Sequence, residues 1–247
     1  MTQGKGWILV SGASRGIGRA TCGQLATSGF DICCWSRSST GLEDVERSIT
    51  KMGRRVRAAQ VDVGNITNVI NAMQDFEQSS ENLVGVVINA GAGKWNYLSR
   101  TSAEEWDTTL ATNLTGAFNV LKVTAPRLSA GGIIVGVLSD SVLYPFEKRA
   151  AYSAAKSGMR SLLEVARREY RPRGIRVSLI FPSRVDTYFE GGHPNAKPGI
   201  RTDALQARDV ASVISNLFLQ PISVELREVH ISAVTATFGP FPERSGA

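Results

Sequence analysis

A tyrosine, a lysine and a serine in the middle of the chain have the types and spacing that proton-transfer chemistry needs. Tyr152 and Lys156 are four residues apart at the expected start of a helix, so both side chains project from one face. An ammonium beside a phenol favours the phenolate and lowers the pKa of the tyrosine from about 10 toward the neutral range. Ser139 falls at the expected carboxyl end of a strand, the edge where open α/β sheets bind ligands. A tyrosine and a lysine at this spacing are also common as packing residues, and the nearby serine is what favours chemistry.

A glycine-rich turn follows the first expected strand. It reads Gly12, Ser14, Arg15, Gly16, Ile17 and Gly18 at its informative positions and opens into an expected helix. A strand–turn–helix of this kind presents backbone N–H groups and the positive end of the helix dipole to a pyrophosphate. The spacing is GxxxGxG, and no Gly-Lys-Ser/Thr follows, which disfavours a P-loop. A tight structural turn is the alternative.

The second expected strand ends in Ser36-Arg37, where a NAD-binding fold usually places an acid on the ribose 2′-hydroxyl. A guanidinium there pairs with a 2′-phosphate, and Arg15 would supply a second cation. These residues favour NADP(H) over NAD(H). The alternative is a pair of arginines on the surface.

The elements that must position these residues alternate along the chain. Short apolar or β-branched runs predict strands at residues 7–10, 31–35, 56–61, 83–89, 132–138, 176–181 and 226–231, and helical periodicity predicts helices at 16–28, 42–52, 66–77, 103–128, 153–170 and 208–219. The fold class is therefore α/β: one Rossmann-type domain over residues 1–247, with a doubly wound seven-stranded parallel sheet and helices on both faces. The aperiodic stretch 183–202 is the expected substrate loop within it.

Composition excludes several classes of protein. With 43% hydrophobic and 20% charged residues among 247, the chain is an ordinary globular protein. No apolar run reaches the ~18 residues of a membrane span, and no signal-peptide pattern is present. We therefore expect a cytoplasmic protein that does not associate with a membrane. Three cysteines and two histidines without metal-ligand spacing predict no metal and reduced thiols. The net charge is +6, but the clustered arginines are interleaved with acidic residues and no nucleic-acid motif accompanies them. We therefore expect no nucleic-acid partner.

Together these motifs make the whole chain resemble the short-chain dehydrogenase/reductase family. The match is specific because separate motifs occur in the family's order. They are the glycines Gly12, Gly16 and Gly18, the aspartate expected beside an adenine in Asp62-Val63, the Asn89-Ala90-Gly91 motif, and the tetrad Asn113, Ser139, Tyr152 and Lys156.

The resemblance implies a mechanism and an assembly. NADPH would deliver hydride to a carbonyl carbon while Tyr152 protonates the oxygen and Ser139 polarises it. Lys156 would lower the tyrosine pKa and bind the nicotinamide ribose, and Asn113 would hold a water in a proton relay. Val185 and Thr187 match the segment that touches the nicotinamide carboxamide, and Pro182 is also expected to bind the cofactor. Relatives usually form homo-tetramers or dimers, and the resemblance implies the same here.

Three departures from the family pattern bear on the substrate. Pro182-Ser183 replaces the usual Pro-Gly, and Asp140 puts a carboxylate directly after the candidate serine, facing either the pocket or solvent. The C-terminal strand lacks the pattern of many 3-oxoacyl-carrier-protein reductases. Aromatic residues would either wall the pocket or pack ordinarily; they are Trp95, Tyr144, Phe146, Tyr188 and Phe189.

We therefore expect an NADPH-dependent oxidoreductase that reduces a ketone or aldehyde, acting on a small-molecule carbonyl substrate. A 3-oxoacyl-thioester reductase is the alternative, in which surface arginines such as Arg127 and Arg173 would meet an acidic carrier protein. A non-catalytic NADP(H)-binding regulator is an alternative of another class, which the intact tetrad disfavours.

Overall fold

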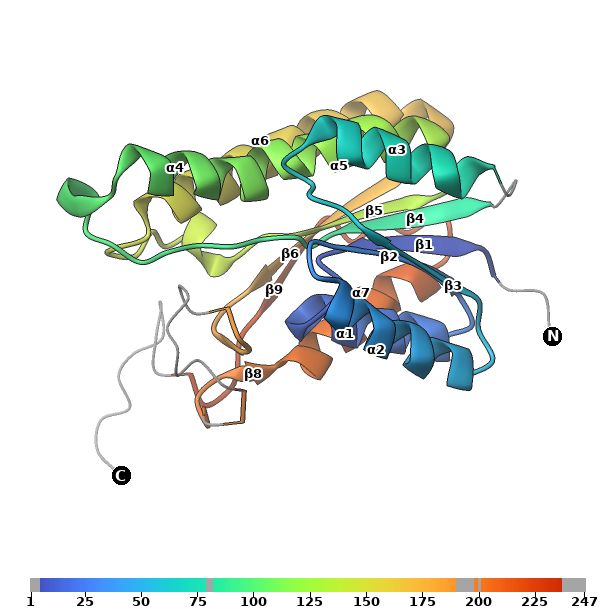
Figure 1. The fold of residues 1–247 in the computed structure, drawn as a ribbon, viewed down its shortest axis with the longest axis horizontal. Coiled ribbons are helices and arrows are strands. Elements are labelled where there is room, and N and C mark those ends of the chain that lie inside the picture. Colours follow the sequence, from blue (N-terminus) through green and yellow to red (C-terminus); the bar gives the residue numbers. More distant parts are fainter. Residues whose placement is uncertain (1–4, 79–81, 190–197, 200, 237–247) are drawn as a thin grey trace.

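The computed structural model describes residues 5–78, 82–189, 198–199 and 201–236, and within them one parallel sheet forms the centre of the molecule (Figure 1). The order of its strands is β3-β2-β1-β4-β5-β6-β9. Their bounds are β1 Trp7–Ser11, β2 Asp31–Ser36, β3 Val56–Gln60, β4 Leu83–Ile88, β5 Ile133–Val137, β6 Arg176–Pro182 and β9 Glu228–Ile231. All six pairings are parallel, which confirms the predicted doubly wound sheet. The order reverses between β1 and β4, and this is the switch point where such sheets bind ligands.

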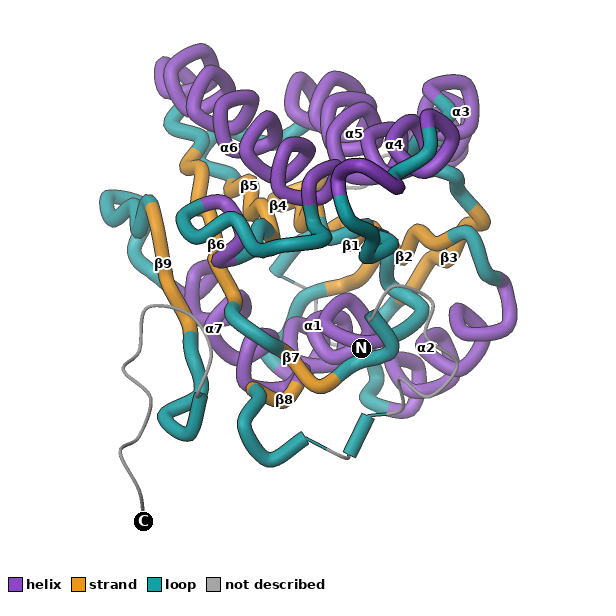
Figure 2. Tube along the Cα trace, turned by 90° about the vertical axis from the view of Figure 1, so that its left-hand side faces the viewer, coloured by secondary structure: helices purple, strands orange, loops and turns teal. Residues whose placement is uncertain are grey.

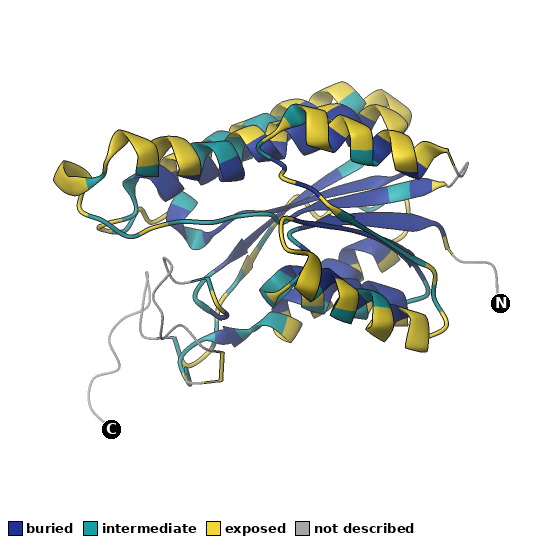
Figure 3. Cartoon of the chain, viewed as in Figure 1, coloured by how far each residue is buried: buried dark blue, intermediate teal, exposed yellow. Residues whose placement is uncertain are grey.

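Helices cover both faces of the sheet (Figure 2). One layer holds α1 Gly16–Thr27, α2 Ser39–Lys51 and α7 Ala207–Leu219, and the other holds α3 Ile66–Glu77, α4 Ala103–Leu110, α5 Gly116–Thr124 and α6 Ala150–Tyr170. The central strands are buried on both faces, so they are continuous apolar runs rather than alternating ones. Figure 3 shows the buried sheet between helices whose outer faces are exposed.

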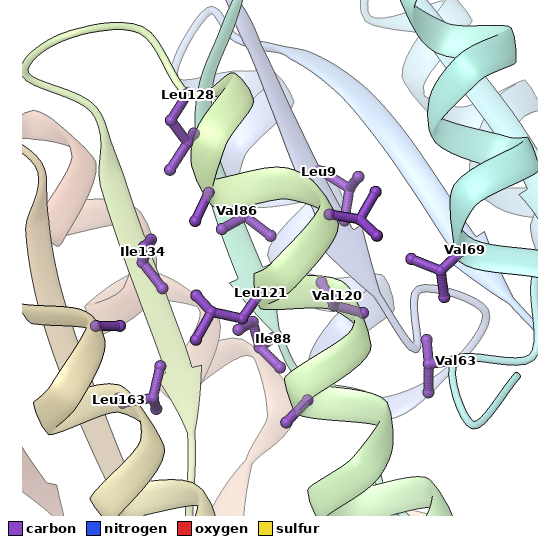
Figure 4. Packing of buried hydrophobic residues seen from close by; sticks show 14 of the residues in the cluster. Leu9, Val63, Val69, Val86, Ile88, Val120, Leu121, Leu128, Ile134 and Leu163 are labelled. Atoms are coloured by element: carbon purple, nitrogen blue, oxygen red, sulfur yellow. The ribbon is translucent and has the colours of Figure 1, made fainter. Parts of the chain in front are cut away.

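Strand side chains alternate between two hydrophobic cores. Leu9 and Val86 point to the layer of α5, where Val120 packs on them (Figure 4). Ile8 and Val10 point to the opposite layer, with α1, α2 and α7. Because successive strand residues face opposite sides, both cores are drawn from the same short runs.

Several predicted boundaries were wrong. The single helix predicted over residues 103–128 is α4, a π-helical turn at Ala111–Thr115, α5, and a short 3₁₀ turn at Ala125–Arg127 that contains Pro126. A proline lacks the N–H that an α-helix interior needs, so the regular helix ends before it. Helices α2 and α6 begin three residues earlier than predicted, and β9 begins two residues later. Among the described residues, none of the helices is both long and apolar enough to cross a membrane.

The stretch predicted as a substrate loop contains structure of its own. Its strand β7 Val185–Asp186 pairs in parallel with β8 Leu205–Gln206, which lies just after the predicted stretch. Positions 190–197 and 200 of the predicted loop lie outside the described residues. Its described part therefore connects β6 to α7 through a small second sheet.

Candidate active site

A cavity of about 510 Å³ lies at the carboxyl ends of the strands, beside the switch point. Most of the predicted site residues line it: Gly12, Ser14, Arg15, Gly16, Ile17, Ser36, Arg37, Val63, Asn89, Ala90, Gly91, Ser139, Tyr152, Lys156, Pro182, Val185 and Thr187. Gly18, Asp62 and Asn113 are not part of the lining. The fold thus brings together residues that are up to 175 positions apart, from Gly12 to Thr187.

The glycine turn and the first residues of α1 line this cavity. Gly12 and Gly16 have φ values of +69° and +55°, which favour glycine. Helix α1 begins at Gly16 on an extended Arg15, and no side chain of the described residues caps its first turn. The N-terminus of this helix, free of a side-chain cap, suits an anionic phosphate.

Gly18 acts behind the turn rather than in the cavity. A Cβ at this position would lie 2.1 Å from the carbonyl oxygen of Gly12, closer than any side chain permits. The glycine lets the start of α1 approach the end of β1. Its role is to shape the phosphate-binding turn.

Asn89 clamps the same turn to β4. Its Nδ2 donates to the carbonyl oxygens of Ser11 at 3.0 Å and Gly12 at 3.2 Å. The backbone N–H groups of Asn89 and Ala90 both donate to the Ser11 hydroxyl, at 3.0 and 3.1 Å. The Asn-Ala-Gly motif therefore holds the end of β4 against the glycine turn.

The two other predicted cofactor positions differ in their surroundings. Ser36 donates to the hydroxyl of Ser14 at 2.7 Å, which ties β2 to the glycine turn and leaves Arg37 at the cavity edge. Asp62 is exposed and accepts from the N–H of Gly64 at 3.0 Å, so it shapes the turn after β3.

The candidate proton donor is buried. Tyr152 is only 6% exposed, and burial raises its pKa to about 12, against the lowering effects of a hydrogen bond with Ser139 and of the Arg149 cation. The expectation that Lys156 sets a low tyrosine pKa was wrong for the free protein. Lys156 Nζ lies 5.8 Å from the centre of the phenol ring and donates to the Val137 carbonyl oxygen at 2.8 Å. Burial lowers the pKa of Lys156 to about 8.

Asn113 stands on the π-helical turn, beside the lining residues. Its Nδ2 donates to the carbonyl oxygens of Ala92 at 2.5 Å and Thr109 at 2.8 Å. Its Oδ1 is buried and has no hydrogen-bond partner among the described residues. Wide helical turns are frequent at functional sites, and a buried oxygen of this kind calls for a water or a ligand.

Aromatic rings form one wall around the phenol. Trp95 packs edge-on against Tyr152, with ring centres 5.4 Å apart, and Phe189 lies 5.5 Å from the same ring. Tyr188 also lines the cavity, whereas Tyr144 and Phe146 do not. Three of the five predicted aromatic residues thus wall the cavity.

Three arginines of the wall were not among the predicted site residues, namely Arg149, Arg184 and Arg201. Arg149 precedes α6 by one residue, lies over the Trp95 ring at 4.5 Å, and stands one helical turn before Tyr152. Arg184 pairs with Asp203 at 2.8 Å. The spacing of Arg149 to Tyr152 was a usable signal. Arg184 and Arg201 fall within the predicted substrate loop 183–202, although neither was singled out there.

The fold and this cavity define a class: a doubly wound α/β protein with a phosphate-binding turn and a Ser-Tyr-Lys constellation at its switch point. The family model described as short chain dehydrogenase matches residues 6–196. The chain belongs to the short-chain dehydrogenase family, and it is an oxidoreductase of that family.

Several relatives and solved structures are similar to it. A 3-oxoacyl-[acyl-carrier-protein] reductase of Aggregatibacter actinomycetemcomitans is 34% identical over 73% of this chain and 76% of that protein. An uncharacterised oxidoreductase of Staphylococcus epidermidis is 27% identical over 92% of this chain and 96% of that protein. An alcohol dehydrogenase from the archaeon Thermococcus sibiricus, solved with 5-hydroxy-NADP, superposes with a TM-score of 0.87 at 28% identity, covering 93% of this chain and 97% of that one.

Proposed function

We propose that the protein is an NADPH-dependent reductase that converts a ketone or aldehyde to an alcohol. The observation that carries the proposal is one cavity that holds Ser139, Tyr152 and Lys156 at one end and the glycine turn with Arg37 at the other. A phosphate site and a proton donor at the two ends of one cavity are what binding of a dinucleotide cofactor requires.

The residues present fit a nicotinamide dinucleotide. Gly12 and Gly16 would let the backbone approach a pyrophosphate, and the start of α1, which no side chain in the described part of the chain caps, would bind it. Arg37 and Arg15 line the cavity beside Ser36, where an acid would select NAD(H). A guanidinium there supports the choice of NADPH. The Thermococcus sibiricus relative was solved with an NADP derivative, which agrees with this choice.

The side chains divide the work of the reaction. Bound NADPH would supply hydride to the carbonyl carbon. Because its pKa is about 12, Tyr152 is a neutral phenol at neutral pH and can donate its proton to the carbonyl oxygen. Ser139 would hold that oxygen and Lys156 would bind the nicotinamide ribose. The Oδ1 of Asn113, which has no hydrogen-bond partner among the described residues, would hold a water that reloads the proton.

A 3-oxoacyl-thioester reductase is the second candidate, and the 34% identity to a reductase of that name favours it. The two arginines expected to meet a carrier protein are committed elsewhere. Arg127 pairs with Glu77 at 2.7 Å, and Arg173 donates to the carbonyl oxygens of Ala125 and Pro126, both at 3.1 Å. These contacts leave the stand-alone reductase ahead. A regulator that binds NADP(H) without turnover is the third candidate. It is disfavoured because Tyr152, the candidate proton donor, lines the same cavity as Ser139 and Lys156.

The test follows oxidation of NADPH and of NADH with a panel of acetoacetyl thioesters, diketones, quinones and aromatic ketones. We expect NADPH to be preferred by about tenfold or more and Tyr152→Phe to lose about 10²-fold or more in kcat. Tyr144→Phe is the matched control, because this exposed tyrosine lies outside the cavity lining. Turnover of thioesters alone would favour the second candidate.

Cofactor choice has its own variant pair. Arg37→Ala should weaken NADPH binding and leave NADH binding unchanged, whereas Arg47→Ala, which removes an exposed arginine paired with Asp44, should alter neither. A better reaction with NADH than with NADPH in the wild type would contradict the assignment of Arg37.

We also propose a homo-oligomer, dimeric or tetrameric, in the cytoplasm. Half-exposed apolar side chains on neighbouring helices support an association surface, namely Trp106 on α4, Phe118 on α5 and Val165 on α6. Light scattering on the purified protein measures the mass, and a monomer would contradict this proposal.

A further inference from the structure

Asp140 places a carboxylate beside the hydroxyl that should polarise the substrate. It directly follows Ser139, lines the cavity, and accepts a hydrogen bond from the Ser139 hydroxyl at 3.0 Å. The sequence left open whether Asp140 faces the pocket or solvent, and the structure places it in the cavity wall. This contact competes with the task that the proposed function gives to Ser139.

A serine hydroxyl has one hydrogen to donate. At Ser139 the hydrogen can go to Asp140 Oδ1 or to Ser141 Oγ at 3.2 Å, while the Ser141 N–H occupies a lone pair of the same oxygen, also at 3.2 Å. The same hydroxyl also lowers the pKa of Tyr152, whose phenol lies in the same cavity. An ionised carboxylate is the strongest acceptor of this set, so it holds the hydrogen.

We propose that Asp140 is a positioning residue that decides which partner receives the single hydroxyl hydrogen of Ser139 and thereby how strongly this serine polarises a substrate carbonyl. When Asp140 is ionised, Ser139 donates to it and presents only a lone pair to the substrate oxygen. When Asp140 is neutral, its own O–H donates to Ser139, and the Ser139 hydrogen turns to the carbonyl. The neutral form therefore builds a donor chain whose hydrogen bonds strengthen one another.

The charges around Asp140 come from three segments. Arg149, just before α6, and Arg184, after β6, both lower the pKa of Asp140, and Tyr152 on α6 is the acidic neighbour. Burial outweighs the two cations and raises the pKa of Asp140 above its ordinary value of 3.8. Reduction should therefore speed up as the pH falls through this pKa.

The inference rests on the proposed function, and the kinetic test compares pH profiles of kcat for reduction. We expect wild-type kcat to fall by about tenfold as Asp140 ionises, and Asp140→Asn to keep the faster rate across the same range, because an amide N–H can donate to Ser139. Glu147→Gln, the same change at an exposed position of the same loop, should follow the wild type. An Asp140→Asn profile identical to that of the wild type would overturn the proposal.

A second readout needs no substrate. The phenolate absorbance of Tyr152, taken as the difference from Tyr152→Phe, gives its pKa in the wild type and in Asp140→Asn. The carboxylate raises the pKa of Tyr152, so the amide variant should titrate at lower pH. In a Ser139→Ala background the direct Coulombic part of this shift should remain and the part transmitted through the hydroxyl should be lost, so the shift should shrink without vanishing.

The two readouts separate the two proposals. An absent shift, or one of full size without the Ser139 hydroxyl, would overturn the role of Asp140. A clear shift in a protein that reduces none of the carbonyl compounds would refute the proposed function and leave the coupling of Asp140 to Tyr152 established.

Discussion

Replacing Lys156 by methionine should stabilise the protein. The ammonium is 3% exposed, and burial lowers the pKa of Lys156 from 10.5 to about 8. Because one pKa unit corresponds to about 1.4 kcal/mol, holding this charge in the fold costs about 3 kcal/mol at neutral pH. Methionine keeps an apolar side chain of similar length and leaves the Val137 carbonyl without its partner, a loss of about 1 kcal/mol. The net expected gain is about 2 kcal/mol.

The pH dependence of the stability difference between Lys156→Met and the wild type shows whether the buried charge causes it. At neutral pH Lys156 is protonated in both the folded and the unfolded protein, so the full cost is present. Between 8 and 10.5 the folded protein holds fewer protons than the unfolded chain, so wild-type stability rises relative to Lys156→Met. Above 10.5 both states are neutral and the electrostatic gain of the variant vanishes.

Urea unfolding at several pH values measures these free energies. Lys51→Met, at an exposed position of α2, is the control and should change stability by less than about 0.5 kcal/mol. The reasoning is refuted if Lys156→Met is less stable than the wild type at neutral pH, or if its advantage does not shrink as the pH rises. Loss of reductase activity in the same variant would show that the buried ammonium is kept for function.

Two further substitutions test the backbone of the site. Gly18→Ala puts a Cβ 2.1 Å from the Gly12 carbonyl oxygen and should cost about 2 kcal/mol of stability and weaken NADPH binding, measured by urea unfolding and fluorescence titration, whereas Gly23→Ala in the same helix meets nothing within 4 Å and should be neutral or stabilising. Lys148 has a φ of +65°, so Lys148→Gly should raise the thermal midpoint, with a gain of about 1 kcal/mol; a lower midpoint would contradict strain at this position.

The fold was predictable because its signals are local. Apolar runs such as Ile133–Val137 predict buried strands wherever helices cover both faces, and crossovers of helical length impose parallel pairing. The order of the strands then follows from few allowed topologies. The π-helical turn at Ala111–Thr115 was not predictable, because a single wide turn hardly changes the helical period of the apolar residues around it.

The positions of the site were more predictable than their chemistry. Residue types and spacing predicted a common site for Ser139, Tyr152 and Lys156, and all three line one cavity. The pKa of Tyr152 was missed because it depends on burial, which is a property of the packed protein, and on Arg149, whose side chain reaches the site from outside the motif. Gly18 was assigned to the cofactor for its type, while only the packed turn shows that it serves the approach of α1 to β1.

Burial disfavours the charged forms of both Tyr152 and Lys156. It raises the pKa of Tyr152 to about 12 and lowers that of Lys156 to about 8, so the cavity disfavours both phenolate and ammonium. An ion pair between them is therefore not the resting state of the free protein. The resting state at neutral pH is a phenol that still holds its proton. A phenol can give its proton to a carbonyl oxygen but cannot take one from an alcohol, so the proposed reduction can use this state directly. Alcohol oxidation would first have to generate the phenolate against the desolvation that burial imposes. The same low polarity makes each hydrogen bond to a developing oxyanion stronger, so under the proposed function the partner that receives the Ser139 hydrogen should have a large effect on the rate.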